Sequence, residues 1–427
     1  MKVVREVMAM HKAGHAVGIY SACSAHPLVI EAALRHARRE SGSVLIEATS
    51  NQVNQDGGYT GMRPADFSRF VLAIAARADV PREQVLLGGD HLGPNCWQDL
   101  PAETAMAKAE QLIADYVAAG FRKIHLDCSM SCVDDPTPLS DAVVAARAVR
   151  LCAVAEQTWR RSGGEAPMYV VGTEVPVPGG AQEALTELAV TEPRAATATI
   201  DAHWDAFQSA GLHHVWPRVI GLVVQPGVEF DHYKVLDFQP PRAVELAAVV
   251  EAQPYMVYEA HSTDYQTPAN LRALVKSHFA ILKVGPGLTF AMREALWALD
   301  AIENEWLGAD RSSQLRQTIR KAMTATPRFW NKYYLSDGPQ LALDQQYSLS
   351  DRIRYYWPVP EVDAALNRLL ANLDANPPPL TLLSQYLPLQ YEAVRAGRIR
   401  HHARDLVLHG IEQVLQQYSA ACTDHAN

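Results

Sequence analysis

The chain has 427 residues, of which 48% are hydrophobic, so it can bury a large core. Its formal net charge of -9 argues against a nucleic acid or an anionic membrane surface as the main partner. The first residues lack an apolar signal core, and no apolar run could span a bilayer. The six cysteines show neither zinc-finger spacing nor a dense disulfide framework. These features favour a cytoplasmic protein.

Eight short apolar runs rich in Val and Ile predict strands that are buried on both faces. They span residues 17–23, 43–48, 85–89, 123–127, 169–173, 219–225, 256–259 and 281–285. Amphipathic segments lie between them, for example at 104–119, 241–250 and 271–278, and predict helices. We therefore expect residues 1–300 to form a TIM-like (β/α)8 barrel. The competing open, doubly wound sheet is not favoured, because no Gly-x-Gly-x-x-Gly turn follows the first strand.

Beyond about residue 300 the pattern becomes helical and aromatic. Residues 303–323, 362–373 and 403–418 are predicted helices, and the segments 329–334 and 350–357 are rich in Tyr, Trp and Phe. We expect residues 301–427 to form a C-terminal helical extension that packs on the barrel. Its aromatic side chains, including Tyr355, Tyr356 and Trp357, would be either core anchors or a surface for a partner.

Titratable side chains stand where several of the predicted strands end. Asp90 and His91 close the third strand, and Glu47, Asp127, Glu174, Glu259 and His261 stand at or just after the ends of other strands. The carboxyl ends of all the strands meet at one mouth of a barrel, where such enzymes build their sites. Three of these residues, His91, Glu174 and His261, form a two-histidine, one-carboxylate set suited to zinc, manganese or a similar divalent metal.

The remaining strand-end carboxylates are candidates for catalysis. Asp90, beside His91, would transfer a proton near a metal-bound substrate. Asp127, Glu47 and Glu259 would act as further acids or bases, or would orient the imidazoles. A histidine such as His91 can equally be a hydrogen-bonded core residue, and that alternative stays open.

A phosphate site is predicted after the last two strands, because barrels often bind phosphate there with backbone N–H groups. The candidate residues are Ser262, Asp264, Lys283, Gly285, Gly287 and Thr289. The glycines alone also fit an ordinary tight turn. Together with a metal at the same mouth, they predict a phosphorylated polar substrate. No nucleotide cofactor is expected, because the chain has no P-loop and no clear nucleotide-binding motif.

Several strings of residues resemble known sugar-phosphate enzymes. Gly89-Asp90-His91, Gly172-Thr173-Glu174, the segment 260–264 and Lys283-Val284-Gly285 resemble the landmarks of zinc-dependent class II ketose-bisphosphate aldolases. Over nearly its whole length the chain resembles the accessory, Z-type subunit of tagatose-1,6-bisphosphate aldolase, the KbaZ/GatZ family. The segments that carry this closer resemblance are 23–27, 47–53, 57–62, 88–95, 125–130, 172–180, 224–232, 259–266 and 384–391.

The resemblance implies a protein of galactitol or N-acetylgalactosamine catabolism, at the tagatose 6-phosphate and tagatose 1,6-bisphosphate steps. It implies an accessory subunit that supports the activity and stability of a catalytic Y-type aldolase subunit, which would be its partner alongside copies of itself. Some relatives are linked to metal-dependent 4-epimerisation of ketohexose phosphates, so an enzyme that converts tagatose 6-phosphate to fructose 6-phosphate is the alternative. The older description of the group as tagatose 6-phosphate kinases finds little support, because the chain has no P-loop motif.

One residue departs from the aldolase pattern. Those enzymes generally carry a histidine where this chain has Glu174. A carboxylate makes the predicted site harder and more negative, which favours manganese or magnesium over zinc.

Overall fold

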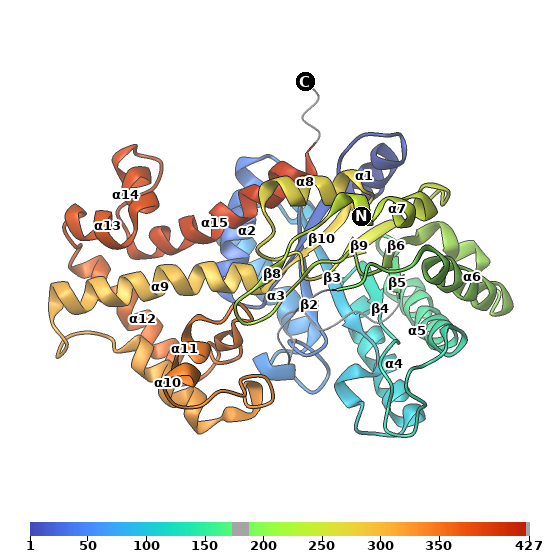
Figure 1. Ribbon diagram of the computed structural model, residues 1–427, viewed down its shortest axis with the longest axis horizontal. Coiled ribbons are helices and arrows are strands. Elements are labelled where there is room, and N and C mark those ends of the chain that lie inside the picture. The colour runs from blue at the N-terminus through green and yellow to red at the C-terminus, as the bar shows by residue number, and fades with distance from the viewer. Residues whose placement is uncertain (173–187, 424–427) are drawn as a thin grey trace.

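The computed structural model describes residues 1–172 and 188–423, and eight parallel strands form a closed barrel in it (Figure 1). The strands are β1 (Ile19–Cys23), β2 (Val44–Thr49), β3 (Val85–Leu92), β4 (Lys123–Leu126), β5 (Met168–Gly172), β6 (Val219–Val223), β9 (Val257–Ala260) and β10 (Ile281–Val284). They pair in the order β1-β10-β9-β6-β5-β4-β3-β2, which confirms the predicted barrel. A short antiparallel pair, β7 (Glu229–Phe230) and β8 (Val235–Leu236), was not predicted.

Helices alternate with the strands and then continue alone. The helices as far as the last strand are α1 (Lys2–Lys12), α2 (Pro27–Arg39), α3 (Pro64–Arg77), α4 (Ala102–Ala118), α5 (Asp141–Ser162), α6 (Pro193–Ser209), α7 (Val244–Glu251) and α8 (Pro268–Lys276). Those after it are α9 (Pro286–Leu307), α10 (Leu315–Ala325), α11 (Gly338–Tyr347), α12 (Pro360–Ala375), α13 (Leu380–Tyr386), α14 (Pro388–Arg395) and α15 (Ala403–Cys422). Short 3-10 turns are η1 (Gly58–Thr60), η2 (Arg82–Gln84), η3 (Pro94–Trp97), η4 (His213–Arg218), η5 (Pro240–Arg242), η6 (Pro327–Phe329) and η7 (Arg352–Tyr355). Many of the α-helices begin with proline, whose fixed φ suits the first turn and which has no N–H group to leave unpaired.

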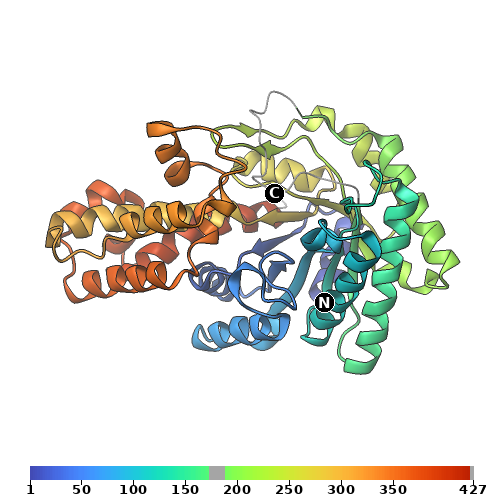
Figure 2. The ribbon, with the colours of Figure 1, turned by 90° about the horizontal axis from the view of Figure 1, so that it is seen from below.

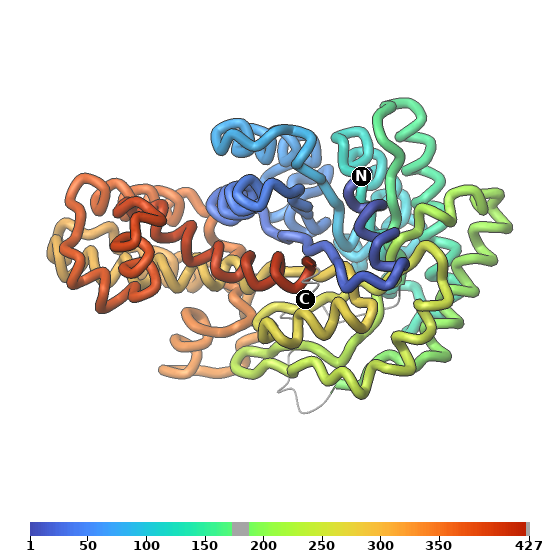
Figure 3. The backbone as a smooth tube through the Cα atoms, turned by 90° about the horizontal axis from the view of Figure 1, so that it is seen from above, coloured from blue at the N-terminus to red at the C-terminus, as the bar shows by residue number. Residues whose placement is uncertain are grey.

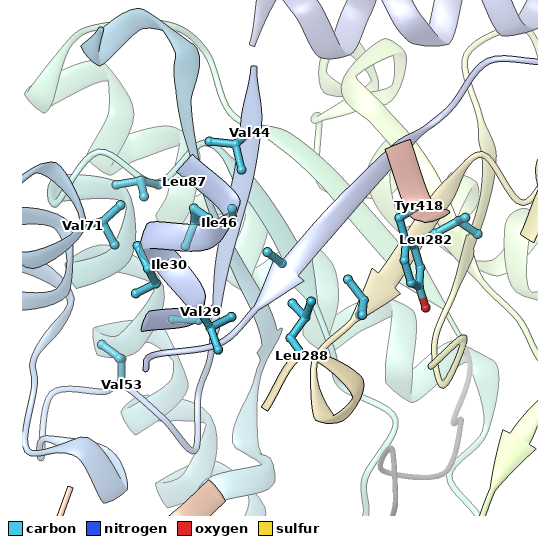
Figure 4. Close-up of a cluster of buried hydrophobic side chains, with 14 of the residues drawn as sticks. Val29, Ile30, Val44, Ile46, Val53, Val71, Leu87, Leu282, Leu288 and Tyr418 are labelled. Carbon is cyan, nitrogen blue, oxygen red and sulfur yellow. The ribbon is translucent and has the colours of Figure 1, made fainter. Parts of the chain in front are cut away.

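The barrel has separate apolar cores inside and outside the ring of strands. At its amino-terminal end, inward side chains such as Leu45, Leu86 and Ile281 pack with Met1, Val4 and Met8 of the first helical segment, so α1 closes that end. The larger core lies between the strands and the surrounding helices, and Figure 4 shows part of it, with Val29 and Ile30 of α2 near Ile46 of β2. Charged side chains of the barrel interior lie above the inner apolar layer, toward the carboxyl end of the strands.

The C-terminal helices extend from one side of the barrel (Figure 2). The predicted single helix at 303–323 is wrong: α9 ends at Leu307, Gly308 follows with φ 81°, and α10 begins at Leu315. The left-handed backbone at Gly308 cannot continue a helix. The predicted boundary at residue 300 falls within α9, so the division of the chain into two domains stays a prediction.

The last helix ties the extension to the barrel. Figure 3 shows α15, in red, running from the extension back to the barrel, where it packs against α2, α8 and α9. Of the aromatic residues in the extension, Tyr356 and Trp357 are 1% and 4% exposed, so they are core anchors rather than a partner surface. Among the described helices, none is both long and apolar enough to cross a membrane.

Candidate active site

A cavity of about 360 Å³ opens at the carboxyl ends of the barrel strands. Nine of the residues predicted from the sequence line it: Asp90, His91, Asp127, His261, Ser262, Asp264, Lys283, Gly285 and Thr289. Glu47 and Glu259 are fully buried below it. Gly287 lies beside it in the first turn of α9, and Glu174 lies outside the described residues. Most of the predicted side chains therefore meet at the predicted mouth.

Under the cavity lies a layer of four alternating charges, which we call the ionic layer: Glu47, Lys123, Glu259 and Lys283. The Nζ atom of Lys123 lies 2.8 Å from Glu47 Oε1 and 2.5 Å from Glu259 Oε2, and all three side chains are completely buried. Lys283 pairs with Glu47 from the other side and lies 3.0 Å from Asp90 Oδ1 and 3.8 Å from Glu259 Oε1. Two carboxylates and two ammonium groups leave this layer neutral, which makes their joint burial tolerable.

Space for the ionic layer comes from a glycine on the neighbouring strand. A Cβ atom on Gly88 would lie 2.5 Å from Glu47 Oε1, so only glycine leaves room for that carboxylate. The two lysines are held as cations: burial lowers the pKa of each, but the surrounding carboxylates outweigh it, and the pKa of Lys283 is well above its ordinary value. A protonated amine is no nucleophile, so neither lysine is suited to forming a Schiff base with a ketose.

Asp90 and Asp127 are the two carboxylates that reach the cavity floor. Burial favours the neutral form of Asp90, but the charges of His91 and Lys283 and a hydrogen bond with His125 hold its pKa well below the ordinary value. Asp127 is likewise held ionised against burial, chiefly by its hydrogen bond with His91, whose Nδ1 lies 2.8 Å from Asp127 Oδ2. Both groups are therefore ready to accept a proton or to orient an imidazole.

Three imidazoles face one another beside these carboxylates. The ring centroids of His91, His125 and His261 are 4.9 to 5.4 Å apart. Each ring has one nitrogen bound to a carboxylate: His91 Nδ1 to Asp127 at 2.8 Å, His125 Nδ1 to Asp90 at 3.0 Å, and His261 Nε2 to Glu259 at 2.9 Å. Carboxylates that fix one imidazole nitrogen in this way commonly leave the other for a metal ion.

The Nδ1 atom of His261 is the most informative atom of the site. Burial lowers the pKa of His261 to about 4, so the ring is neutral near pH 7. With Nε2–H donating to Glu259, Nδ1 carries a lone pair, and this buried atom has no partner among the described residues. A buried acceptor without a donor is costly, and a bound cation would satisfy it.

The donor set fits a divalent metal. Asp90, His125, Glu259 and His261 bring one donor atom each to within 4.8 Å of one another. A second group, Cys23, Glu47 and Asp90, is equally close, but the ammonium group of Lys283 already contacts two of its members. The imidazole side is therefore the better place for an ion.

Three of the eight described non-glycine residues with a positive φ angle lie at this mouth. His91, Ser262 and Tyr265 have positive φ angles of 50°, 54° and 65°. Residues other than glycine rarely adopt this backbone conformation. Where they do, they are commonly part of a functional site. At His91 it turns the chain at the end of β3, directly after Asp90.

The residues predicted to bind phosphate are engaged with the protein itself. The N–H groups of Gly285 and Gly287 donate to Asp264 Oδ1 at 2.9 and 2.7 Å. Thr289 donates to Asp351 at 2.6 Å, and Ser262 donates to Glu229 at 3.1 Å. The amino terminus of α9 therefore already holds a carboxylate in the position that an anion would take.

Comparison with known proteins decides the family. Residues 4–423 match the model of the family described as D-tagatose-1,6-bisphosphate aldolase subunit GatZ/KbaZ-like. The chain belongs to the GatZ/KbaZ-like family.

Solved structures similar to this GatZ/KbaZ-like chain include one close relative. A probable tagatose 6-phosphate kinase from Sinorhizobium meliloti 1021 is 52% identical, with a TM-score of 0.88 over 95% of this chain and 100% of that one. The fructose-bisphosphate aldolase from Campylobacter jejuni is 13% identical, with a TM-score of 0.41 over 87% of this chain and 91% of that one.

Two residues of the candidate site in this GatZ/KbaZ-like chain were missed from the sequence. His125 stands two positions before Asp127 on β4, and alternate residues of a strand share a face, so the period of two could have revealed it. Arg354 lies in η7 of the extension and lines the cavity, and no local pattern in the sequence indicates this.

Proposed function

We propose that this GatZ/KbaZ-like chain is a metal-dependent enzyme that interconverts tagatose 6-phosphate and fructose 6-phosphate by inverting C4. The observation that supports it best is the unpartnered Nδ1 atom of His261, within a group of three imidazoles at a barrel mouth. An idle site would have no need to keep a buried, neutral imidazole with an unsatisfied lone pair.

His125 and His261 would hold the metal, each with its other nitrogen fixed by a carboxylate. His91, predicted as a ligand from the sequence, is not among the donors within 4.8 Å of one another. Against the effect of burial, Asp90 and Asp127 raise the pKa of His91 to about 9, which favours the imidazolium form. Glu174, predicted as a ligand from the sequence, stays a candidate outside the described residues. A divalent ion bound there would supply Lewis-acid polarisation of the ketose oxygens. The ionic layer below keeps the floor of the site rigid and neutral.

The chemistry of a ketohexose favours one route for inverting C4. The hydrogen on C4 is not adjacent to the C2 carbonyl, so removing it as a proton is not activated. The hydroxyl on C4 is β to that carbonyl, and removing its proton allows the C3–C4 bond to break, with the electron pair passing to C3 and the C2 oxygen. The C4 aldehyde then turns its other face to C3, the bond re-forms, and O4 recovers its proton.

Asp90 is the residue we assign to that proton. It lines the cavity and lies beside the imidazole group, within reach of a substrate bound there. An ionised carboxylate can accept the proton from O4 and return it, so no net proton is consumed. Asp127 fixes His91 through the 2.8 Å hydrogen bond, and Glu259 fixes His261, so these two carboxylates are positioning residues.

A second candidate function follows from the family description, which names a subunit of tagatose-1,6-bisphosphate aldolase. In that role the chain would bind and stabilise a catalytic Y-type aldolase subunit in tagatose 6-phosphate catabolism. A kinase activity, as in the description of the Sinorhizobium relative, is not proposed, because the chain has no Gly-x-x-x-x-Gly-Lys-Ser/Thr phosphate loop.

The test is the metal content of the chain purified alone, measured by mass spectrometry together with conversion of tagatose 6-phosphate to fructose 6-phosphate. We expect about one ion per chain, and turnover that is lost with the ion in His261→Ala. His214→Ala, on an exposed ring, is the matched control and keeps both. Bound metal without turnover, in a chain that still stabilises the Y-type aldolase on mixing, would reject the epimerase in favour of the subunit.

A further inference from the structure

One wall of the cavity is built by the C-terminal extension rather than by the barrel. Arg354, Tyr355 and Trp357, from η7 and the residues after it, line the cavity together with the barrel residues. The extension is therefore part of the site, and its arginine is the feature that the proposed reaction leaves without a role.

Arg354 is held in place before any ligand arrives. Its Nη1 atom donates to the carbonyl oxygens of Ser350 and Asp351, and its Nη2 atom donates to the Tyr355 hydroxyl at 3.1 Å. The guanidinium carbon lies 4.7 Å from the centre of the Tyr355 ring, which in turn stacks on Phe329 with centroids 5.0 Å apart. A side chain that is already held in one conformation loses less conformational entropy when an anion binds to it.

Arg354 makes no direct ion pair in the part of the chain that the structure describes, although the nearby carboxylate of Asp351 helps to raise its pKa. Lys123, Lys283 and Arg293 all pair with buried carboxylates, whereas no ion pair joins Arg354 to a described carboxylate. Its three hydrogen bonds go to neutral oxygens and use only Nη1 and Nη2, so the Nε–H group keeps no acceptor among the described residues. A guanidinium has five N–H donors and stays charged at any physiological pH, so this one can still bind an anion.

The usual anion site of a barrel is already filled in this protein. Asp264 accepts the N–H groups of Gly285 and Gly287 at the start of α9, where a phosphate would otherwise bind. A phosphate entering the cavity would need another cation, and Lys283 is engaged with Glu47 and Asp90. Among the described residues of the cavity wall, Lys283 and His91 pair with carboxylates, and Arg354 is the cation that makes no direct ion pair.

We infer that Arg354 binds the phosphate group of the sugar phosphate, and so makes the extension a specificity element of the barrel site. This inference rests on the proposed function for the identity of the sugar but not for the anion site. Arginine matches phosphate with paired N–H donors, and Tyr59, whose ring lies 4.8 Å from that of Tyr355, lines the same wall. A sugar without phosphate would lose this contact.

Binding without turnover tests the inference. Isothermal titration compares tagatose 6-phosphate, free tagatose and inorganic phosphate on the full chain and on Arg354→Met and Arg354→Lys. We expect Arg354→Met to bind the phosphate ester roughly 10- to 100-fold more weakly with little change for free tagatose, and Arg354→Lys to recover part of the loss. Arg328→Met removes an exposed arginine that lies over Phe329 outside the cavity, and should bind as the wild type does.

The outcomes separate this inference from the proposed reaction. If the wild-type chain binds the ester through Arg354 but does not convert it, the result would support the phosphate site and reject the epimerase activity. A chain that converts the ester while Arg354→Met retains the full preference for phosphate over free sugar would reject the phosphate site alone. An unchanged melting temperature of Arg354→Met shows that its weaker binding is not caused by unfolding. A wild type with no preference for the ester over free tagatose overturns the inference.

Discussion

Replacing Lys123 by methionine should strongly destabilise the barrel. The lysine lies 2.8 Å from Glu47 and 2.5 Å from Glu259, and none of the three side chains is exposed. Methionine fills a similar volume but leaves the ionic layer with two carboxylates and one ammonium group, a net charge of minus one in a site without solvent. Breaking a buried ion pair on one side costs about 3–5 kcal/mol, so we expect a loss of that size in the free energy of unfolding.

Urea unfolding followed by tryptophan fluorescence at pH 7.5 measures this loss. The double variant Lys123→Met/Glu47→Gln restores neutrality, and we expect it to recover more than about 1 kcal/mol of the loss. Lys108→Met is the control, because its 3.5 Å pair with Asp56 is solvent-exposed and contributes less than about 1 kcal/mol. A loss below about 1 kcal/mol in Lys123→Met, or a double variant less stable than the single one, would refute the role given to the ionic layer.

Three further substitutions test other parts of the structure. Burial raises the pKa of Asp264 to about 6, above its ordinary value of 3.8, so its contribution to stability is complete below pH 3.8 and is lost as the pH rises through 6. The stability of Asp264→Asn relative to the wild type should therefore increase by about 2 kcal/mol between pH 4.5 and pH 7.5 in urea unfolding; a pH-independent difference would contradict this. Gly88→Ala, whose Cβ would lie 2.5 Å from Glu47 Oε1, should cost about 1–3 kcal/mol in the same assay, while Gly42→Ala, in open space, should cost less, and equal losses would argue against a space-making role. Tyr418→Phe removes the 2.7 Å hydrogen bond from α15 to the carbonyl oxygen of Thr263 and should lower the free energy of unfolding by about 1 kcal/mol; no change would show that this bond does not anchor the helix.

The barrel could be predicted because the strands are short, largely apolar runs, a pattern that a parallel sheet covered on both faces requires. The mouth residues followed from these strands, since Asp90, Asp127 and His261 all stand at or just beyond strand ends. The helix at 303–323 failed because periodicity was followed across Gly308, whose left-handed backbone ends α9.

Contacts between distant segments could not be predicted in this way. The sequence favoured Glu47 and Glu259 as catalytic residues, but the lysines that hold them below the cavity come from two other strands. The carboxylate of Asp264 fills the start of α9 only because the loop after β9 folds over it. Such pairings depend on the closed ring of strands and not on local spacing.

The return of α15 to the barrel also sets the order in which this protein can be completed during synthesis. The N–H group of Gly18, just before β1, donates to the carbonyl oxygen of Cys422 at 2.9 Å, and Arg404 of α15 pairs with Glu31 of α2. These partners are separated by about 400 residues, which a ribosome adding about 5–20 residues per second needs on the order of 20–80 s to cover. During that interval the face of α2 that α15 covers in the folded protein is exposed. The nascent chain can therefore associate with other chains through this face until α15 has been synthesised.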